Sequence, residues 1–296
     1  APPSWKGATS MKRARKGRGF PAAGIPFLLW TAFFVAIPLI YILCMSFMKR
    51  AATWGVVAEF SLGSYAKMLS PAYLRVFGES LWLSVLTTGF TLLLGYPFAY
   101  FTAQLSPKRR SLALLLVIVP FWTNSLVRIY GWMILLRSQG VVNALLIALG
   151  VIDTPLKLLY NFGAVLVGMV YALLPFMILS VYNSISKLDP SLTEAARDLG
   201  AGKWRAFWSV TVPMTRAGIM AGCVLVFIPS VGLFFISDLL GGAKTMLLGN
   251  LIKSELLAAR NWPMGAALSV VMMAATLLVI GLYQKLSGEK SLEGIV

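Results

Sequence analysis

Few residues in this chain could do chemistry. Its 296 residues include no histidine, ten Asp and Glu, and two cysteines. Without histidine, most zinc sites, haem sites and Ser-His catalytic arrangements are excluded. Cys44 and Cys223 lie inside apolar runs, where we expect small core hydrophobes rather than a disulfide or a metal site. No nucleotide motif is visible, so we expect a chain that is not an enzyme and binds no cofactor.

One short polar segment has a pattern that predicts a mechanical function. Asp189 is a good N-cap, Pro190 a good first helical residue, and Gly200 is placed to end the helix in the left-handed conformation. A second helix is predicted over 203–212, ending at Pro213. The alanines between the caps give a smooth face that another backbone can approach closely. Such a helix could transmit a push from a partner, or it could be an ordinary helical loop.

Two glycine patterns look functional but have simpler explanations. The segment 241–245 (GGAKT) resembles a phosphate-binding loop, but it lacks the four-residue spacing before Gly-Lys. Gly218 and Gly222 form a G-x-x-x-G spacing, which indicates close helix packing at a contact within the subunit or between subunits.

These segments must be positioned by membrane helices. The chain is 58% hydrophobic and only 12% charged, whereas soluble domains are usually about one quarter charged. Apolar runs near the length of a bilayer predict six spans. The predicted spans cover residues 24–47, 81–105, 111–127, 162–182, 217–237 and 264–283. The first run could be a signal peptide, but its length and the five later spans favour a retained helix.

Two stretches near the third span depart from a plain hydrophobic helix. Its apolar run breaks into polar residues at 120–125 and then reaches Arg128. Polar groups at that depth must face protein or a water-filled path. The stretch 141–149 is apolar but too short to span, which predicts an interfacial or re-entrant helix.

The net charge of +16 has two interpretations. Nucleic acid is disfavoured because no soluble basic domain is long enough to bind it. Basic loops at the inner face of a membrane explain the charge better, and their distribution places both termini in the cytoplasm. We therefore predict a basic cytoplasmic tail (1–23) and a transmembrane domain (24–296), with core spans over 81–283 and an inner loop at 184–216.

That inner loop resembles the EAA motif of ABC importer permeases. Glu194, Ala195, Ala196 and Gly200 match the motif, as does Pro213, while valines at 210 and 212 replace Ile and Leu. The resemblance implies an all-α permease fold of the type I (MetI-like) importer class. It also implies that this segment, with Asp198, is the coupling helix that sits in a groove of a separate ATPase.

Other motifs narrow the resemblance to spermidine/putrescine permeases of the PotB type. They are 120–131 (PFWTNSLVRIYG), 150–155 (GVIDTP), 174–177 (LPFM), 237–244 (SDLLGGAK) and 261–267 (NWPMGAA). The resemblance implies a multi-pass protein of the bacterial inner membrane. Its implied partners are a second homologous permease, two copies of a cytoplasmic ATPase that uses ATP and Mg, and a periplasmic polyamine-binding protein.

A polyamine path needs carboxylates and aromatic faces. Asp238 is the leading candidate because it ends the fifth span beside Phe234 and Phe235, although it could instead cap a helix or pair with Lys244. Further candidates are Trp122, Asn124, Tyr130 and Phe235. For Trp122 and Asn124, helix packing is an equal alternative.

Three other functions stay open at this point. The solute could be another small cationic or amino-acid-like compound. A secondary transporter or channel is less favoured because the spans are nearly free of charge. A membrane enzyme is disfavoured by the lack of histidine and the few inner carboxylates.

Overall fold

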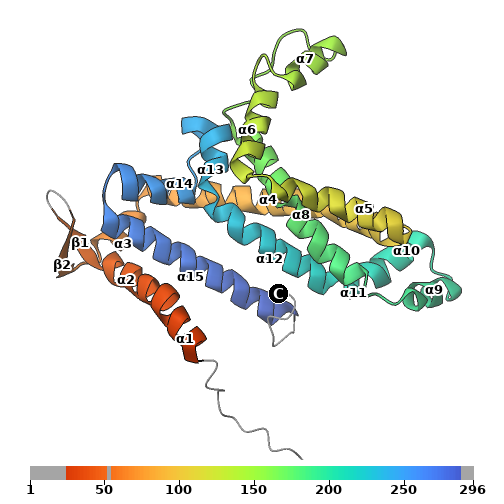
Figure 1. The fold of residues 1–296 in the computed structure, drawn as a ribbon, viewed down its shortest axis with the longest axis horizontal. Coiled ribbons are helices and arrows are strands. Elements are labelled where there is room, and N and C mark those ends of the chain that lie inside the picture. The colour runs from red at the N-terminus through yellow and green to blue at the C-terminus, as the bar shows by residue number, and fades with distance from the viewer. Residues whose placement is uncertain (1–24, 52–54, 288–296) are drawn as a thin grey trace, which may run out of the picture. The chain divides into compact units, whose positions relative to one another are not determined.

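The structure is a computed structural model that describes residues 25–51 and 55–287 (Figure 1). The predicted tail over 1–23 lies outside the described residues. The chain divides into two units, at residues 1–42 and 43–296, which are described separately.

The N-terminal elements are α1 (Ile25–Thr31), η2 (Ala32–Ala36), α2 (Ile37–Ser46), β1 (Met48–Arg50), β2 (Val56–Phe60), α3 (Gly63–Met68), α4 (Pro71–Gln104), α5 (Pro107–Ile118) and η3 (Val119–Trp122). The others are α6 (Ser125–Leu136), α7 (Val141–Ala148), α8 (Phe162–Ile185), α9 (Pro190–Asp198), α10 (Lys203–Ala206), η4 (Phe207–Thr211), α11 (Val212–Met214), α12 (Arg216–Gly232), α13 (Phe234–Ile236), η5 (Ser237–Gly241), η6 (Gly242–Lys244), α14 (Leu248–Lys253), η7 (Ser254–Ala258) and α15 (Trp262–Ser287).

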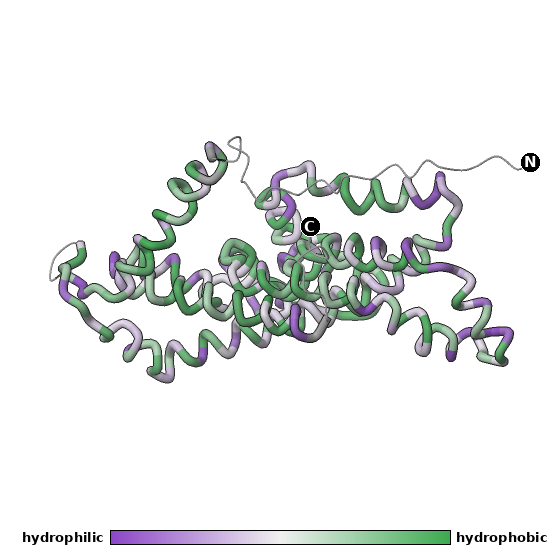
Figure 2. The backbone as a smooth tube through the Cα atoms, turned by 90° about the horizontal axis from the view of Figure 1, so that it is seen from below, coloured by the Kyte–Doolittle hydropathy of each residue, from purple (hydrophilic) through white to green (hydrophobic). Residues whose placement is uncertain are grey.

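Hydropathy and length identify the membrane spans. Five segments of the described residues are long and apolar enough to cross a bilayer, and a bent helix pair raises the number to six. Hydrophobic residues dominate the long helices, whereas hydrophilic residues gather mostly in the connections (Figure 2). The segments are Leu29–Ser46, Pro71–Gln104, Ser125–Ala148, Phe162–Ile185 and Trp262–Lys285, with Lys203–Met214 and Arg216–Gly232 as the bent pair.

Helices α4, α8 and α12 pack side by side at the centre of the second unit (Figure 1). Leu83 of α4 and the α8 residues Met169, Met177 and Val181 have at most trace solvent exposure. Helix α4 begins ten residues before the predicted start, at Pro71. At 1.5 Å per residue its 34 residues extend about 51 Å, well beyond a hydrocarbon core of about 30 Å. The helix is therefore long enough to project past the apolar layer.

The predicted third span over 111–127 is wrong as a single helix. Helix α5 ends at Ile118, a 3₁₀ turn follows, and the helix stops at Thr123, whose backbone is extended. Pro120 lacks an N–H, and the Asn124 side chain caps the new helix α6 by accepting from the Leu126 N–H at 2.8 Å. The predicted short helix at 141–149 is present as α7.

The fifth span also differs from its predicted limits of 217–237. Helix α12 ends at Gly232, and Leu233 separates it from α13. The predicted helix 203–212 does not end at Pro213 but continues to Met214, and it includes a π-helical turn that ends at Thr211, two residues before the proline. The chain then bends by 63° into α12. A π turn before a proline is a common accommodation of its missing donor.

A small hairpin interrupts the otherwise helical fold. Strands β1 and β2 pair antiparallel, with Lys49 opposite Val57 and Arg50 opposite Val56. Nearby, Met68 of α3 packs with Leu248 of α14 and Leu268 of α15 in a separate core cluster. The hairpin was missed because its strands are too short to give a clear alternating pattern.

Candidate functional site

The loop between α8 and α12 folds as predicted at its start. The Asp189 carboxylate accepts a hydrogen bond from the Ser191 N–H at 2.9 Å, and Pro190 occupies the first turn. This backbone hydrogen bond lowers the pKa of Asp189 below its ordinary value. Aspartate is favoured here because it satisfies a free helix N–H and its negative charge suits the positive end of the helix.

Helix α9 ends in a Schellman motif centred on Gly200. The Gly200 N–H donates to the Arg197 carbonyl at 2.9 Å, and the Ala201 N–H donates to the Ala196 carbonyl at 3.0 Å. Gly200 has φ of +86°, which side-chain-bearing residues rarely adopt. The predicted ending of the helix at Gly200 is therefore confirmed. Both ends of this short helix are fixed by specific hydrogen bonds.

The surface of α9 and the turn after it is unusually apolar for a polar loop. Leu199 is 90% exposed, Trp204 77% and Trp208 63%. Glu194 and Ala195 are also exposed, as is Asp198, whereas Ala196 is partly covered. Neighbouring exposed apolar side chains of this size mark an interaction surface more often than a solvated one. We call Leu199, Trp204 and Trp208 the apolar rim of α9.

The chain from α9 into the bundle is physically continuous. The helix 203–214 bends into α12 at Thr215, which is buried. The Thr215 hydroxyl donates to the Thr211 carbonyl at 2.8 Å and lies 3.0 Å from the Tyr96 hydroxyl of α4. Phe207 packs edge-on to Tyr96. A displacement of α9 would therefore reach both α12 and α4 through the bend.

Close packing of α12 against α8 involves the two glycines of the G-x-x-x-G pattern. A Cβ at Gly218 would lie 2.3 Å from the Cβ of Ser184, and one at Gly222 would lie 2.7 Å from the sulfur of Met177. The Ser180 hydroxyl donates to the Gly218 carbonyl at 2.9 Å. Of the two alternatives left open by the sequence, the contact within the subunit is the one observed. It ties the two helices that flank the α9 loop.

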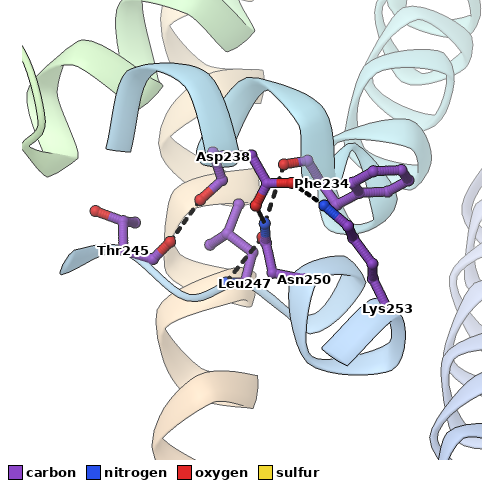
Figure 3. Close-up of polar contacts among 7 residues, drawn as sticks. Phe234, Asp238, Thr245, Leu247, Asn250 and Lys253 are labelled. Carbon is purple, nitrogen blue, oxygen red and sulfur yellow. Dashed lines mark hydrogen bonds and ion pairs between the residues drawn. The ribbon is translucent and has the colours of Figure 1, made fainter. Parts of the chain in front are cut away.

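Asp238 belongs to η5, which directly follows α13. Helix α13 lies beyond the opposite end of α12 from α9 (Figure 1). One carboxylate oxygen accepts from the Lys253 ammonium at 2.6 Å, and the other accepts from the Asn250 side-chain amide (Figure 3). The Lys253 nitrogen also lies 5.2 Å from the centre of the Phe234 ring. The alternative that Asp238 pairs with a lysine is thus observed, but the partner is Lys253 of α14 rather than Lys244.

The other predicted path residues do not gather around Asp238. Trp122 is 77% exposed and Tyr130 48% exposed. Asn124 serves as the N-cap of α6. Phe235 packs against the buried cluster that includes Ile129. Phe234, its neighbour in sequence, supplies the aromatic face near Asp238.

Arg128, which the sequence analysis expects to face protein or a water-filled path, contacts two aromatic rings of the chain. Its guanidinium lies 4.7 Å from the centre of the Phe121 ring and 5.9 Å from that of Tyr171. Both rings therefore make cation–π contacts with an arginine of the chain itself. Sequence spacing gave no signal for this contact, because Tyr171 comes from α8 and Arg128 from α6.

Two adjoining cavities of about 490 and 520 Å³ share Tyr160, Asn161 and Lys244. Arg137 and Lys157 also line the first cavity. Tyr160 has φ of +60° and packs against Gly242, where a Cβ would lie 3.0 Å from its ring. Three cationic side chains make the first cavity unsuited to a positively charged solute.

Comparison with known proteins decides the family. Residues 95–288 match the family described as binding-protein-dependent transport system inner membrane component. The chain belongs to this family. The permease is 48% identical to the spermidine/putrescine transport system permease protein PotB of Salmonella typhimurium (strain LT2), over 87% of this chain and 90% of the relative. It is 45% identical to PotB of Haemophilus influenzae, over 86% of this chain and 90% of the relative.

Solved structures support the same fold. The permease aligns with a chain of a bacterial alginate ABC transporter in complex with alginate pentasaccharide-bound periplasmic protein, with a TM-score of 0.71 and 20% identity. The alignment covers 90% of this chain and 92% of that one. The predicted importer-permease fold is confirmed, apart from the short hairpin. The permease is a multi-pass inner membrane protein.

Proposed function

We propose that this chain is a permease subunit of an ATP-driven ABC importer for the polyamines spermidine and putrescine. The observation that carries the proposal is the exposed, doubly capped helix α9, which bears Glu194, Ala195 and Ala196 and ends at Gly200. Relatives at 45–48% identity are named for spermidine/putrescine transport, which supports the substrate class.

The energy for transport comes from outside the chain. A separate cytoplasmic ATPase, present in two copies, uses ATP and Mg, and its groove receives α9. Glu194, Ala195, Ala196 and Asp198 face that groove, and the apolar rim of α9 is covered by the partner. Gly200 fixes where α9 ends, so that α9 moves as one rigid helix when the ATPase moves. The charged end of α9 and the apolar rim together suit a protein surface rather than lipid or water.

Movement of α9 changes access to the path in the membrane. The helix 203–214 passes the displacement to α12 at the Thr215 bend, and Gly218 ties α12 to α8. Protein interiors are close-packed, so a displaced helix moves its neighbours rather than compressing them. This chain forms one half of the path, and a second homologous permease forms the other.

The substrate arrives from a periplasmic binding protein and meets few charges in this chain. Asp238 with Phe234 is the best place for an ammonium group, since carboxylates and aromatic faces both attract cations. Trp122, Asn124, Tyr130 and Phe235 remain candidate path residues, although the exposure of Trp122 and the capping bond of Asn124 favour other roles for these two. Weak contacts suffice, because tight binding in the permease would slow release.

The proposal is tested by reconstituting the complete assembly in proteoliposomes and measuring ATP-dependent uptake of labelled spermidine. Unlabelled putrescine and spermidine should compete, whereas a neutral sugar and a basic amino acid should not. If the amino acid inhibits the uptake and unlabelled polyamines do not, the proposed substrate class is wrong. The assignment of the chain to its family would still hold.

A further inference from the structure

The strongest unassigned feature of the described chain is the contact between Lys253 and Asp238 (Figure 3). A lysine side chain ends in a primary ammonium on a four-carbon chain. Polyamines carry the same primary ammonium group at their ends. Lys253 therefore presents to Asp238 the chemical group that the proposed substrate would present.

The surroundings form a built ammonium site rather than a chance surface pair. Asn250 is 8% exposed, and its amide donates to one Asp238 oxygen and to the Phe234 carbonyl, the latter at 3.0 Å. The Asn250 side-chain oxygen in turn accepts from the Leu247 N–H. The carboxylate is thus held in place by one buried amide. Its second oxygen and the Phe234 ring are left for a cation.

The site is also open to exchange. The side chains of Lys253 and Asp238 are 44% and 38% exposed. Ion pairs with this exposure are weak, because water competes and screens the charges. A tethered group acts at an effective concentration on the order of mM, so it fills the site when no ligand is present but yields to a ligand with several ammonium groups.

We infer that Lys253 is a tethered stand-in for the substrate, which occupies the Asp238–Phe234 ammonium site until a polyamine ammonium displaces it. The inference rests on the proposed function and deepens it. The exchange keeps the Asp238 carboxylate paired at every stage, which avoids leaving a bare charge near the apolar layer. It also lowers the net affinity for the polyamine and so favours release.

The test measures equilibrium binding of labelled spermidine to the permease–ATPase assembly in nanodiscs of uncharged phosphatidylcholine, without the binding protein. Lys253→Met keeps the length of the side chain and removes the ammonium. We expect it to tighten spermidine binding by about two- to fivefold, the factor that corresponds to a weak exposed ion pair. Lys253→Arg should weaken binding, because a guanidinium pairs with a carboxylate through two hydrogen bonds.

Two further variants isolate the site. The double variant Asp238→Asn with Lys253→Met should show no gain, and Lys244→Met, which removes a nearby lysine that does not pair with Asp238, should bind as the wild type does. Equal or weaker binding by Lys253→Met, with wild-type binding by Lys253→Arg, would mean that Lys253 only ties α14 to η5. If Lys253→Met does not assemble with the ATPase, tighter or unchanged binding by Lys253→Arg overturns the inference by itself.

Failure of the inference and failure of the proposed function give different results. If the wild-type assembly neither binds nor imports spermidine, the substrate class is wrong. If it imports spermidine and the Lys253 variants do not change binding as stated, the proposed function stands and the exchange does not.

Discussion

At the scale of single residues, Asp238 is the carboxylate of the described residues that best suits a cationic solute. Asp238 is half-exposed, is oriented by Asn250 and lies beside an aromatic ring. Three other acidic side chains are engaged elsewhere: Glu59 with Lys49, Glu79 with Arg75 and Glu255 with Tyr73. The importance of Asp238 therefore follows from its place beside α14 and not from its charge alone.

Replacing Asp238 by Asn should reduce polyamine uptake severalfold while basal ATP hydrolysis stays near the wild-type rate. The amide keeps the size of the side chain and its contact with Asn250 but no longer attracts an ammonium group. Both rates are measured in the same proteoliposomes. Glu59→Gln, which removes a carboxylate from an exposed pair on the hairpin, serves as the control. Equal loss of uptake and hydrolysis in Asp238→Asn would indicate a structural role.

Sequence reasoning identified Asp238 but not its partner. Lys244 was the nearer lysine in sequence, yet Lys253 reaches the carboxylate because α14 folds back against η5 and α13. The same limit applies to Phe234 and Phe235. Phe234 faces the ammonium site, whereas Phe235 packs against the core. Which of two adjacent side chains faces a site depends on packing between helices, and a single sequence carries little information on it.

At the scale of elements, α9 is the part of the molecule most fully determined by local sequence. Its N-cap and its Schellman ending both follow from residue types at fixed positions, and both are observed. The break of the third span at Thr123 and the bend at Thr215 are harder to predict from the sequence. They depend on how prolines at 120 and 213 are accommodated by turns of other helix types, which tertiary packing decides.

Gly200→Val should uncouple ATP hydrolysis from uptake. A β-branched residue at φ of +86° costs roughly 1–2 kcal/mol or more, because its Cβ approaches the neighbouring backbone. Gly202, two residues later, has φ of −62° and open space around its Cβ position. Gly202→Val is therefore the matched control and should retain coupled uptake. If both variants transport normally, the ending assigned to α9 does not matter for coupling.

Asp189→Ala should weaken the protection of the α9 loop against protease, while Asp189→Asn should retain most of it, because asparagine can also cap the Ser191 N–H. The pKa of Asp189 is lowered in the folded chain, so the stabilisation of α9 by the charged cap is complete above the ordinary Asp value and is lost as pH falls through the lower folded value. At neutral pH the wild type should therefore show no pH dependence from this group. Protease protection of the loop is the measurement, and equal protection of Asp189→Ala and wild type would contradict the cap.

Gly218→Ala should destabilise the bundle, by about 1–3 kcal/mol, because the added methyl group meets Ser184 and the Ser180 carbonyl. Gly89→Ala on α4, where the added methyl group meets nothing within 4 Å, should be neutral or slightly stabilising. Thermal stability of the purified assembly compares the two. Similar melting temperatures for both variants would show that α8 and α12 separate more easily than their spacing indicates.

At the scale of the whole molecule, the second unit (43–296) is a bundle of membrane helices, with α9 before the start of α12 and α13 and α14 beyond its end (Figure 1). Composition alone predicted the membrane class, and the family motifs predicted the fold. The hairpin of β1 and β2 and the basic cavity around Lys244 carry no such pattern. The strands of the hairpin are too short to give an alternating pattern. The cavity is lined by segments distant in sequence, so only the folded chain reveals it.

The central claim is that this chain transports polyamines only when a separate ATPase drives it through α9. The most direct measurement is spermidine uptake into ATP-loaded proteoliposomes that contain either this chain alone or the complete assembly with its second permease, ATPase and binding protein. We expect uptake by the complete assembly and none above background by the chain alone. Substantial spermidine uptake by this chain alone would contradict the account.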